Sequence, residues 1–98
     1  MIQHIVAFAW NESVPANQSQ VCVDVLMKMS EQIDSIREYR CGANLGVSAS
    51  ANADFVVVAT FDDVEGWRKY DQFPLHEEIR AKYFKPYIAT RMAAQFSF

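Results

Sequence analysis

Three side chains in this sequence could together carry out acid–base chemistry: His4, Tyr70 and His76. A histidine is a natural base near neutral pH, because its imidazole titrates at about 6.5. A tyrosine hydroxyl can donate a hydrogen bond to an oxygen that gains negative charge during a reaction. The sequence therefore predicts one apolar pocket in which His76 is the base, Tyr70 is a proton donor, and His4 orients a substrate carbonyl or His76.

Each of these residues also has an ordinary structural interpretation. Tyr70 could cover the core, with its hydroxyl bonded to water or backbone. His76 could be a helix residue with a backbone partner, and His4 could be a half-buried strand residue whose polar atoms are satisfied. The three lie far apart in the sequence, so the catalytic hypothesis requires that the fold bring their rings together.

A proline at position 74 breaks the segment that carries two of these residues. Proline lacks an N–H and its ring clashes with the preceding turn, but it fits the first position of a helix. The sequence therefore predicts a helix ending near Tyr70, a turn over Asp71–Phe73, and a second helix from Pro74 that stops at Pro86. This places Tyr70 near the break and His76 in the first turn of the second helix.

Residues 2–10 alternate in a way that predicts the first strand, with side chains pointing to opposite faces. One face is bulky and apolar except for a histidine: Ile2, His4, Val6, Phe8 and Trp10. The other face is smaller: Gln3, Ile5, Ala7 and Ala9. Because both faces are largely apolar, we expect the strand to be covered on both sides, by helices or by a second chain.

The next segments predict a helix and a strand. Apolar residues at three- and four-residue steps predict an amphipathic helix that starts after Asn17 or Ser19 and ends near Glu31–Ile33. Its predicted apolar face consists of Cys22, Val25, Leu26, Met29, Ile33 and Ile36. Alternation over Ile36–Leu45 suggests a strand, and the runs CGANLG and SASANA predict a loop.

The remaining segments are predicted from composition and caps. Asp54–Phe61 is short, apolar and β-branched, which is typical of a buried strand. Asp62 or Asp63 can cap the helix that follows it. Alternation from Ile88 to Phe98 predicts the last strand.

This order of elements is that of a ferredoxin-like α+β sandwich, βαββαβ, with the second helix broken at Pro74. Residues 1–98 form one domain, with helices on one face of an antiparallel four-stranded sheet. The apolar second face would be an aggregation liability if left uncovered. We therefore expect a homodimer in which two sheets face each other.

The sequence resembles the stress-responsive A/B barrel domain (Dabb) family, whose members are dimeric α+β barrels. The matching pieces are IQHIVAFAW, CGANLG, the strand ending at Phe61, and YDQFPLH. The resemblance implies a cofactor-free enzyme, if the chain is an enzyme: an aldol-type polyketide cyclase or lyase of the olivetolic acid cyclase type, with matching residues at His4, Tyr70 and His76. The family often ends in an acidic residue before an aromatic one, where this chain has Gln95 and Phe96.

Composition excludes several other classes. A net charge of −3 and the lack of a basic run argue against nucleic acid as a partner. No apolar run approaches the length of a membrane span, and the N-terminus lacks the positive flank of a signal peptide, so a cytoplasmic protein with free Cys22 and Cys41 is expected. Two histidines on separate elements are too few for a catalytic zinc site, and neither a metal nor an organic cofactor is expected.

Three functions remain open at this point. The first is a homodimer that binds or converts a small hydrophobic or carbonyl-containing molecule. The second is a non-catalytic, stress-associated dimer with the same pocket. The third is a cofactor-free oxygenase of quinols, because such enzymes share this barrel.

Overall fold

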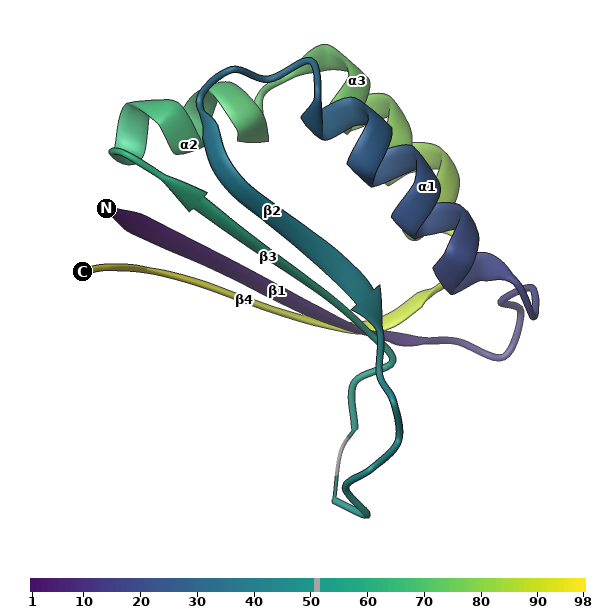
Figure 1. Ribbon diagram of the computed structural model, residues 1–98. Helices are drawn as coiled ribbons and strands as arrows, with labels where there is room; N and C mark the ends of the chain where they lie inside the picture. Colours follow the sequence, from purple (N-terminus) through teal and green to yellow (C-terminus); the bar gives the residue numbers. More distant parts are fainter. Residues whose placement is uncertain (51) are drawn as a thin grey trace.

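A four-stranded antiparallel sheet, covered on one face by helices, makes up the computed structural model, which describes residues 1–50 and 52–98 (Figure 1). The strands pair in the order β2-β3-β1-β4 and comprise β1 (Ile2–Trp10), β2 (Ile36–Ala43), β3 (Phe55–Phe61) and β4 (Ile88–Ser97). The helices are α1 (Gln18–Ser30), α2 (Val64–Asp71) and α3 (Pro74–Ile79), followed by the π-helical turn η1 (Arg80–Phe84). The predicted ferredoxin-like sandwich is confirmed.

The break between α2 and α3 follows the local chemistry of the sequence. Asp63 caps α2, because its Oδ1 accepts a hydrogen bond from the Gly66 amide at 2.8 Å. The helix ends at Asp71, and Pro74 takes the first position of α3, where its missing N–H has no cost. The predicted break at Pro74 is therefore confirmed.

Two boundaries differ from the sequence prediction. Helix α1 ends at Ser30, so Ile33 and Ile36 do not belong to its apolar face: Ile33 lies in a tight turn and Ile36 begins β2. Ile33 is nevertheless buried. Because its apolar side chain lies at a spacing that a helix would also give, the sequence pattern placed it on the helix. Strand β2 runs to Ala43, because Gly42 pairs with Val56, so the CGANLG segment begins inside a strand.

The loop between β2 and β3 projects away from the sheet (Figure 1). It contains the rest of CGANLG and the SASANA run, of which Ala51 lies outside the described residues. Gly46 adopts a left-handed conformation, with φ of 76°, which favours glycine at this position. The Gly46 amide donates to the Asn44 side-chain oxygen at 2.8 Å, an Asx turn that bends the chain there.

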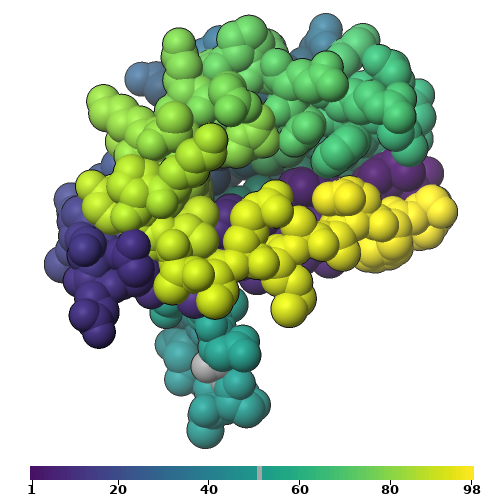
Figure 2. Space-filling view, turned by 180° about the vertical axis from the view of Figure 1, so that it is seen from behind, coloured from purple at the N-terminus to yellow at the C-terminus, as the bar shows by residue number. Residues whose placement is uncertain are grey.

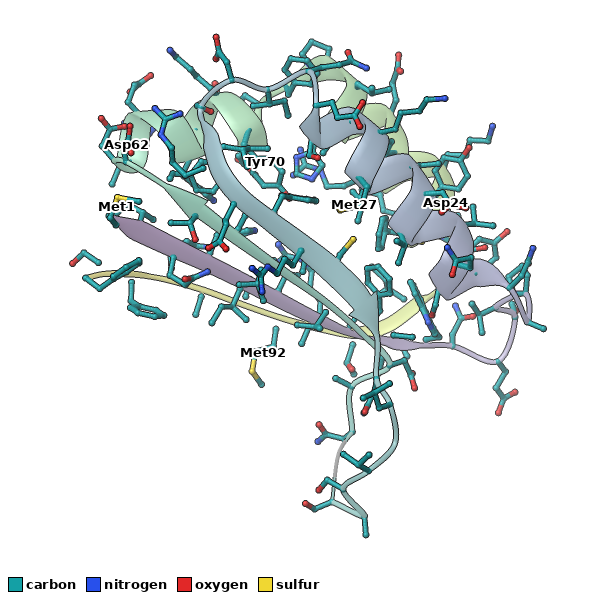
Figure 3. The ribbon with its side chains drawn as sticks, viewed as in Figure 1. Met1, Asp24, Met27, Asp62, Tyr70 and Met92 are labelled. Carbon is teal, nitrogen blue, oxygen red and sulfur yellow. The ribbon has the colours of Figure 1, made fainter. Side chains whose placement is uncertain are left out.

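The two faces of the sheet differ in cover. The helices lie over one face, and no element of the described chain covers the other (Figure 1). Figure 3 shows the Met92 side chain pointing away from the helices, toward this uncovered side, where it is 75% exposed. We call this second surface the open face; its strand residues include Gln3, Ile5, Ala7, Val56, Val58, Met92, Ala94 and Phe96.

Candidate functional site

A single row of residues across the sheet forms the floor of the candidate site. The strand register aligns Tyr39 of β2, Ala59 of β3, His4 of β1 and Gln95 of β4. Directly paired residues point to the same side of a sheet, and this row points toward the helices. His4, Ala59 and Tyr39 are buried there.

The ring of Tyr70, from the end of α2, lies over this row between the helices and the sheet (Figure 3). Its centroid is 5.6 Å from that of His4, 5.7 Å from that of Tyr39 and 4.3 Å from that of His76. Tyr70 therefore lies between the two histidines and links the sheet to α3.

A cavity of about 150 Å³ lies beside these rings. His4, Tyr70 and His76 all line it, together with apolar side chains such as Phe8, Leu26 and Phe84. Figure 2, which views the molecule from the β4 side, shows the surface hollowed between that strand and the helices. We call this space the central cavity. The structure thus brings the three predicted residues together, while their roles in a reaction stay a prediction.

His76 presents an unprotonated nitrogen. Its Nδ1 lies 2.9 Å from the Tyr70 backbone carbonyl, which can only accept a hydrogen bond, so Nδ1 carries the proton. Nε2 then has a free lone pair. Among the described residues, every fully enclosed side-chain nitrogen or oxygen has a hydrogen-bond partner. Nε2 of His76 has none, so it is not fully enclosed and must touch open space.

Burial keeps His76 neutral. The pKa of His76 is lowered from 6.5 to about 4, mainly because burial removes the ring from water and also because the charge of Arg80 is near. At pH 7 the imidazole is therefore unprotonated and able to accept a proton.

His4 has the opposite tautomer. The indole Nε1–H of Trp67 donates to its Nδ1 at 3.2 Å, and an indole nitrogen can only donate. The Gln95 amide nitrogen approaches the same Nδ1 at 2.9 Å. The proton of neutral His4 therefore lies on Nε2, which makes the residue a hydrogen-bond donor. Burial lowers its pKa to about 4, and the charges of His76 and Arg91 act in the same direction.

Tyr70 shares a hydrogen bond with a residue that sequence reasoning did not assign to the site. Its hydroxyl lies 3.1 Å from that of Tyr39, and both rings are buried. Two hydroxyls carry two protons and one contact uses only one, so the second proton is available to another acceptor. Burial raises the pKa of Tyr70 to about 12 and also raises the pKa of Tyr39, so both stay protonated.

Arg80 fixes α3 against the end of α2. Its guanidinium donates to the Asp71 carboxylate at 3.1 Å, to the Asp71 carbonyl at 2.7 Å and to Glu77 at 2.7 Å. These bonds hold His76 at a set distance from Tyr70. Arg80 lies in the π-helical turn η1, a feature often found at functional sites.

Other chemistries find little support in the described residues. These contain no group of three or more His, Cys, Asp or Glu side chains that could hold a metal ion. Cys22 and Cys41 are free thiols, and burial raises the pKa of Cys22 to about 11, so it is a poor nucleophile. A second hollow of about 370 Å³ adjoins Ile2, Val64 and Phe96, and no titratable group lines it.

Within the part of the chain that the structure describes, no helix is both long enough and apolar enough to cross a bilayer.

Comparison with known proteins identifies relatives over nearly the whole chain. The sequence model of a family described as the stress responsive A/B barrel domain matches residues 2–98. An uncharacterized protein of Streptomyces coelicolor is 28% identical over 79 residues, which are 79% of this chain and 80% of that protein.

Two solved structures illustrate the structural likeness. A dimeric ferredoxin-like protein of unknown function from Thermobifida fusca is 37% identical, with a TM-score of 0.89 over 99% of this chain and 90% of its own. A hydroxynitrile lyase from Passiflora edulis is 17% identical, with a TM-score of 0.80 over 97% of this chain and 90% of its own. The second likeness shows the fold alone.

Proposed function

The chain belongs to the stress responsive A/B barrel domain family, and we propose that it forms a homodimer in which each subunit binds and converts a small carbonyl compound in the central cavity. His76 is the base that removes a proton from a carbon next to the carbonyl. Tyr70 and His4 donate hydrogen bonds to the oxygen that becomes negative. A polyketide-like compound with two carbonyls could then close by an aldol step.

The observation that supports this proposal most directly is the pair of opposite histidine tautomers. His76 offers a lone pair at Nε2, and His4 offers an N–H at Nε2. An enolisation needs both: the base takes the proton, the C–H electrons form the carbon–carbon double bond, and the carbonyl electrons move to the oxygen. The negative oxygen then stabilises the imidazolium that forms on His76.

The open face supports the homodimer. Ile5 and Val56 are each 36% exposed, Phe96 is 52% exposed, and Met92 more so. A contiguous apolar surface of this kind on one sheet is typical of an interface. The Thermobifida fusca relative is dimeric.

Proton exchange at a ketone tests the proposed reaction without knowledge of the natural substrate. Phenylacetone in D2O loses the protons of its CH2 group when a base removes them, and NMR follows the loss. We expect the protein to accelerate this exchange, and His76→Ala to reduce the acceleration about 10²- to 10⁴-fold. Met27→Ala, at an exposed site on α1, is the control and should leave it unchanged.

The proposal is wrong if His76→Ala exchanges protons as fast as the unmodified protein. It is also wrong if neither phenylacetone nor a β-diketone exchanges faster with the protein than with buffer alone.

A second candidate is a dimer that binds a ligand without turnover. The observation that favours it is that the Tyr70 hydroxyl and His76 Nδ1 already have partners inside the protein. In that case small ketones and phenols should raise the melting temperature without any exchange. Oxygen uptake with a small hydroquinone would instead identify a quinol oxygenase.

A further inference from the structure

Positive charge gathers around the central cavity of a chain whose net charge is −3. Three cationic side chains line the cavity, Arg80, Lys85 and Arg91, against the single carboxylate of Asp71. The two histidines add no charge at neutral pH, because both are held neutral by burial. The lining therefore carries an excess of positive charge that no histidine supplies.

The three cations differ in how far they are neutralised. Arg80 is engaged by Asp71 and Glu77, as described above. Lys85 lies 3.9 Å from Glu77 and is mostly exposed. Arg91 makes no hydrogen bond or ion pair within residues 1–50 and 52–98. Its guanidinium is therefore free to pair with a group that enters the cavity.

The strand register directs Arg91 toward the cavity. Arg91 pairs with Phe8, whose ring lines the cavity, and it shares the helix-facing side of β4 with Gln95. Gln95 contacts His4, which is about 13 Å along the strand from Arg91. Both residues line the same cavity, and the charge of Arg91 is near enough to lower the pKa of His4.

The volume of the cavity limits the size of the uncharged part of any ligand that binds there. A cavity of about 150 Å³ is the size that accepts a single benzene ring in an engineered protein. Most of the exposed lining is apolar, and apolar side chains such as Val6, Phe8 and Val57 provide it. A body of one ring, or a short branched chain, is therefore the largest that fits.

We infer that the natural ligand is a small organic acid, whose carboxylate pairs with Arg91 while its apolar body fills the central cavity. This inference deepens the proposed function, on which it rests for the identity of the ligand site: the carbonyl compound is an acid. An arginine fork binds a carboxylate in two parallel hydrogen bonds, which fixes the direction in which the rest of the molecule enters. The carbonyl would then face His4 and His76.

A matched pair of probes tests the charge alone. Phenylacetate and phenylacetamide have the same ring and nearly the same shape, but only phenylacetate is anionic. Isothermal titration gives the two dissociation constants, and NMR of the only two histidines locates the binding. We expect the acid to bind about tenfold more tightly or better, with an affinity that falls as salt is added.

Variants then assign the charge to one residue. Arg91→Gln should weaken phenylacetate about tenfold and leave phenylacetamide unchanged, which also shows that the cavity is intact. Arg68→Gln removes an exposed arginine on α2 that is paired with Glu65, and it should change neither affinity. The inference is wrong if the amide binds the unmodified protein as tightly as the acid does, or if Arg91→Gln binds the acid normally.

The salt dependence tests the inference even if Arg91→Gln fails to fold, because it requires no variant. A failure of this inference is distinct from a failure of the proposed function. If the protein exchanges ketone protons but shows no preference for acids, only the inference of an acidic ligand is wrong. If it prefers acids but exchanges no ketone protons, only the proposed reaction is wrong.

Discussion

The two faces of the sheet use the same four strands in opposite ways. On the helix-facing side, His4 and Tyr39 are buried among the apolar side chains of the core, and each has a hydrogen-bond partner. On the open face, several residues of the same strands are apolar and exposed: Ile5, Val56, Met92 and Phe96. The helix-facing side therefore encloses polar rings within an apolar core, and the open face exposes apolar side chains.

This difference indicates that the two faces serve different purposes. A buried polar group is costly unless it is hydrogen-bonded, so a row of them indicates a site rather than a packing solution. An exposed apolar surface is costly unless a partner covers it. The helix-facing side is therefore where we place the chemistry, and the open face is where we place the second chain.

A charge on the open face should give the largest effect. Ile5→Glu or Met92→Glu would bury an unpaired carboxylate in each half of the dimer interface, a change that costs several kcal/mol. We expect the dimer to dissociate more than about a hundredfold more readily, as measured by analytical ultracentrifugation. Met27→Glu, on α1 and equally apolar, is the control. An unchanged dimer in both variants would exclude this face as the interface.

A fall in pH should give the second-largest effect, a loss of folding stability that originates on the helix-facing side. Both histidines have folded-state pKa values of about 4, below the value of 6.5 for an exposed histidine. The unfolded chain therefore binds more protons between these values, and stability present above pH 6.5 is lost as the pH falls toward 4. Each histidine contributes at most about 1.4 kcal/mol per pH unit.

Urea denaturation at several pH values measures this loss. The double variant His4→Gln, His76→Gln should lose stability less steeply over the same range, since only the carboxylates then titrate. Equal slopes for the two proteins would mean that the histidines are not held neutral by the fold.

Exchanging Gln95 for a carboxylate should raise the pKa of His4. In Gln95→Glu an opposite charge would lie within hydrogen-bond distance of Nδ1 and favour the imidazolium, by about one pKa unit or more. Gln32→Glu, at an exposed position in the turn after α1, is the control and should have little effect on either histidine. NMR titration of the histidine protons provides the measurement. A pKa of His4 that is the same in both variants would contradict the hydrogen bond from Gln95.

The sequence predicted the elements well, because each has a local cause. Pro74 can begin a helix but not continue one, and the alternation of β1 defines its two faces without any knowledge of the fold. The end of α1 was predicted less well, because Ile33 is buried in a turn at the same spacing that a helix would give.

The composition of the site depended on non-local contacts. His4, Tyr70 and His76 could be proposed because histidine is rare here and both side-chain types are chemically distinctive. Tyr39 was assigned only to a strand, since its neighbours in the row are set by register between strands that are distant in sequence. The tautomers depended on Trp67 and on the Tyr70 carbonyl, which no spacing rule connects to the histidines.

The smallest of these effects should come from the hydroxyl of Tyr39. Tyr39→Phe keeps the ring that packs against Tyr70 but removes one hydrogen bond. Such a hydrogen bond contributes about 1 kcal/mol to the stability of the fold. Denaturant unfolding should show a loss of that size, whereas Tyr87→Phe, at a half-buried tyrosine outside the cavity, should show almost none. If Tyr39 donates to Tyr70, ketone exchange should also change, because Tyr70 then donates its own proton into the cavity. A loss of stability with exchange unaffected would mean that the pair is structural, and that His4 alone supplies the hydrogen bond to the substrate oxygen.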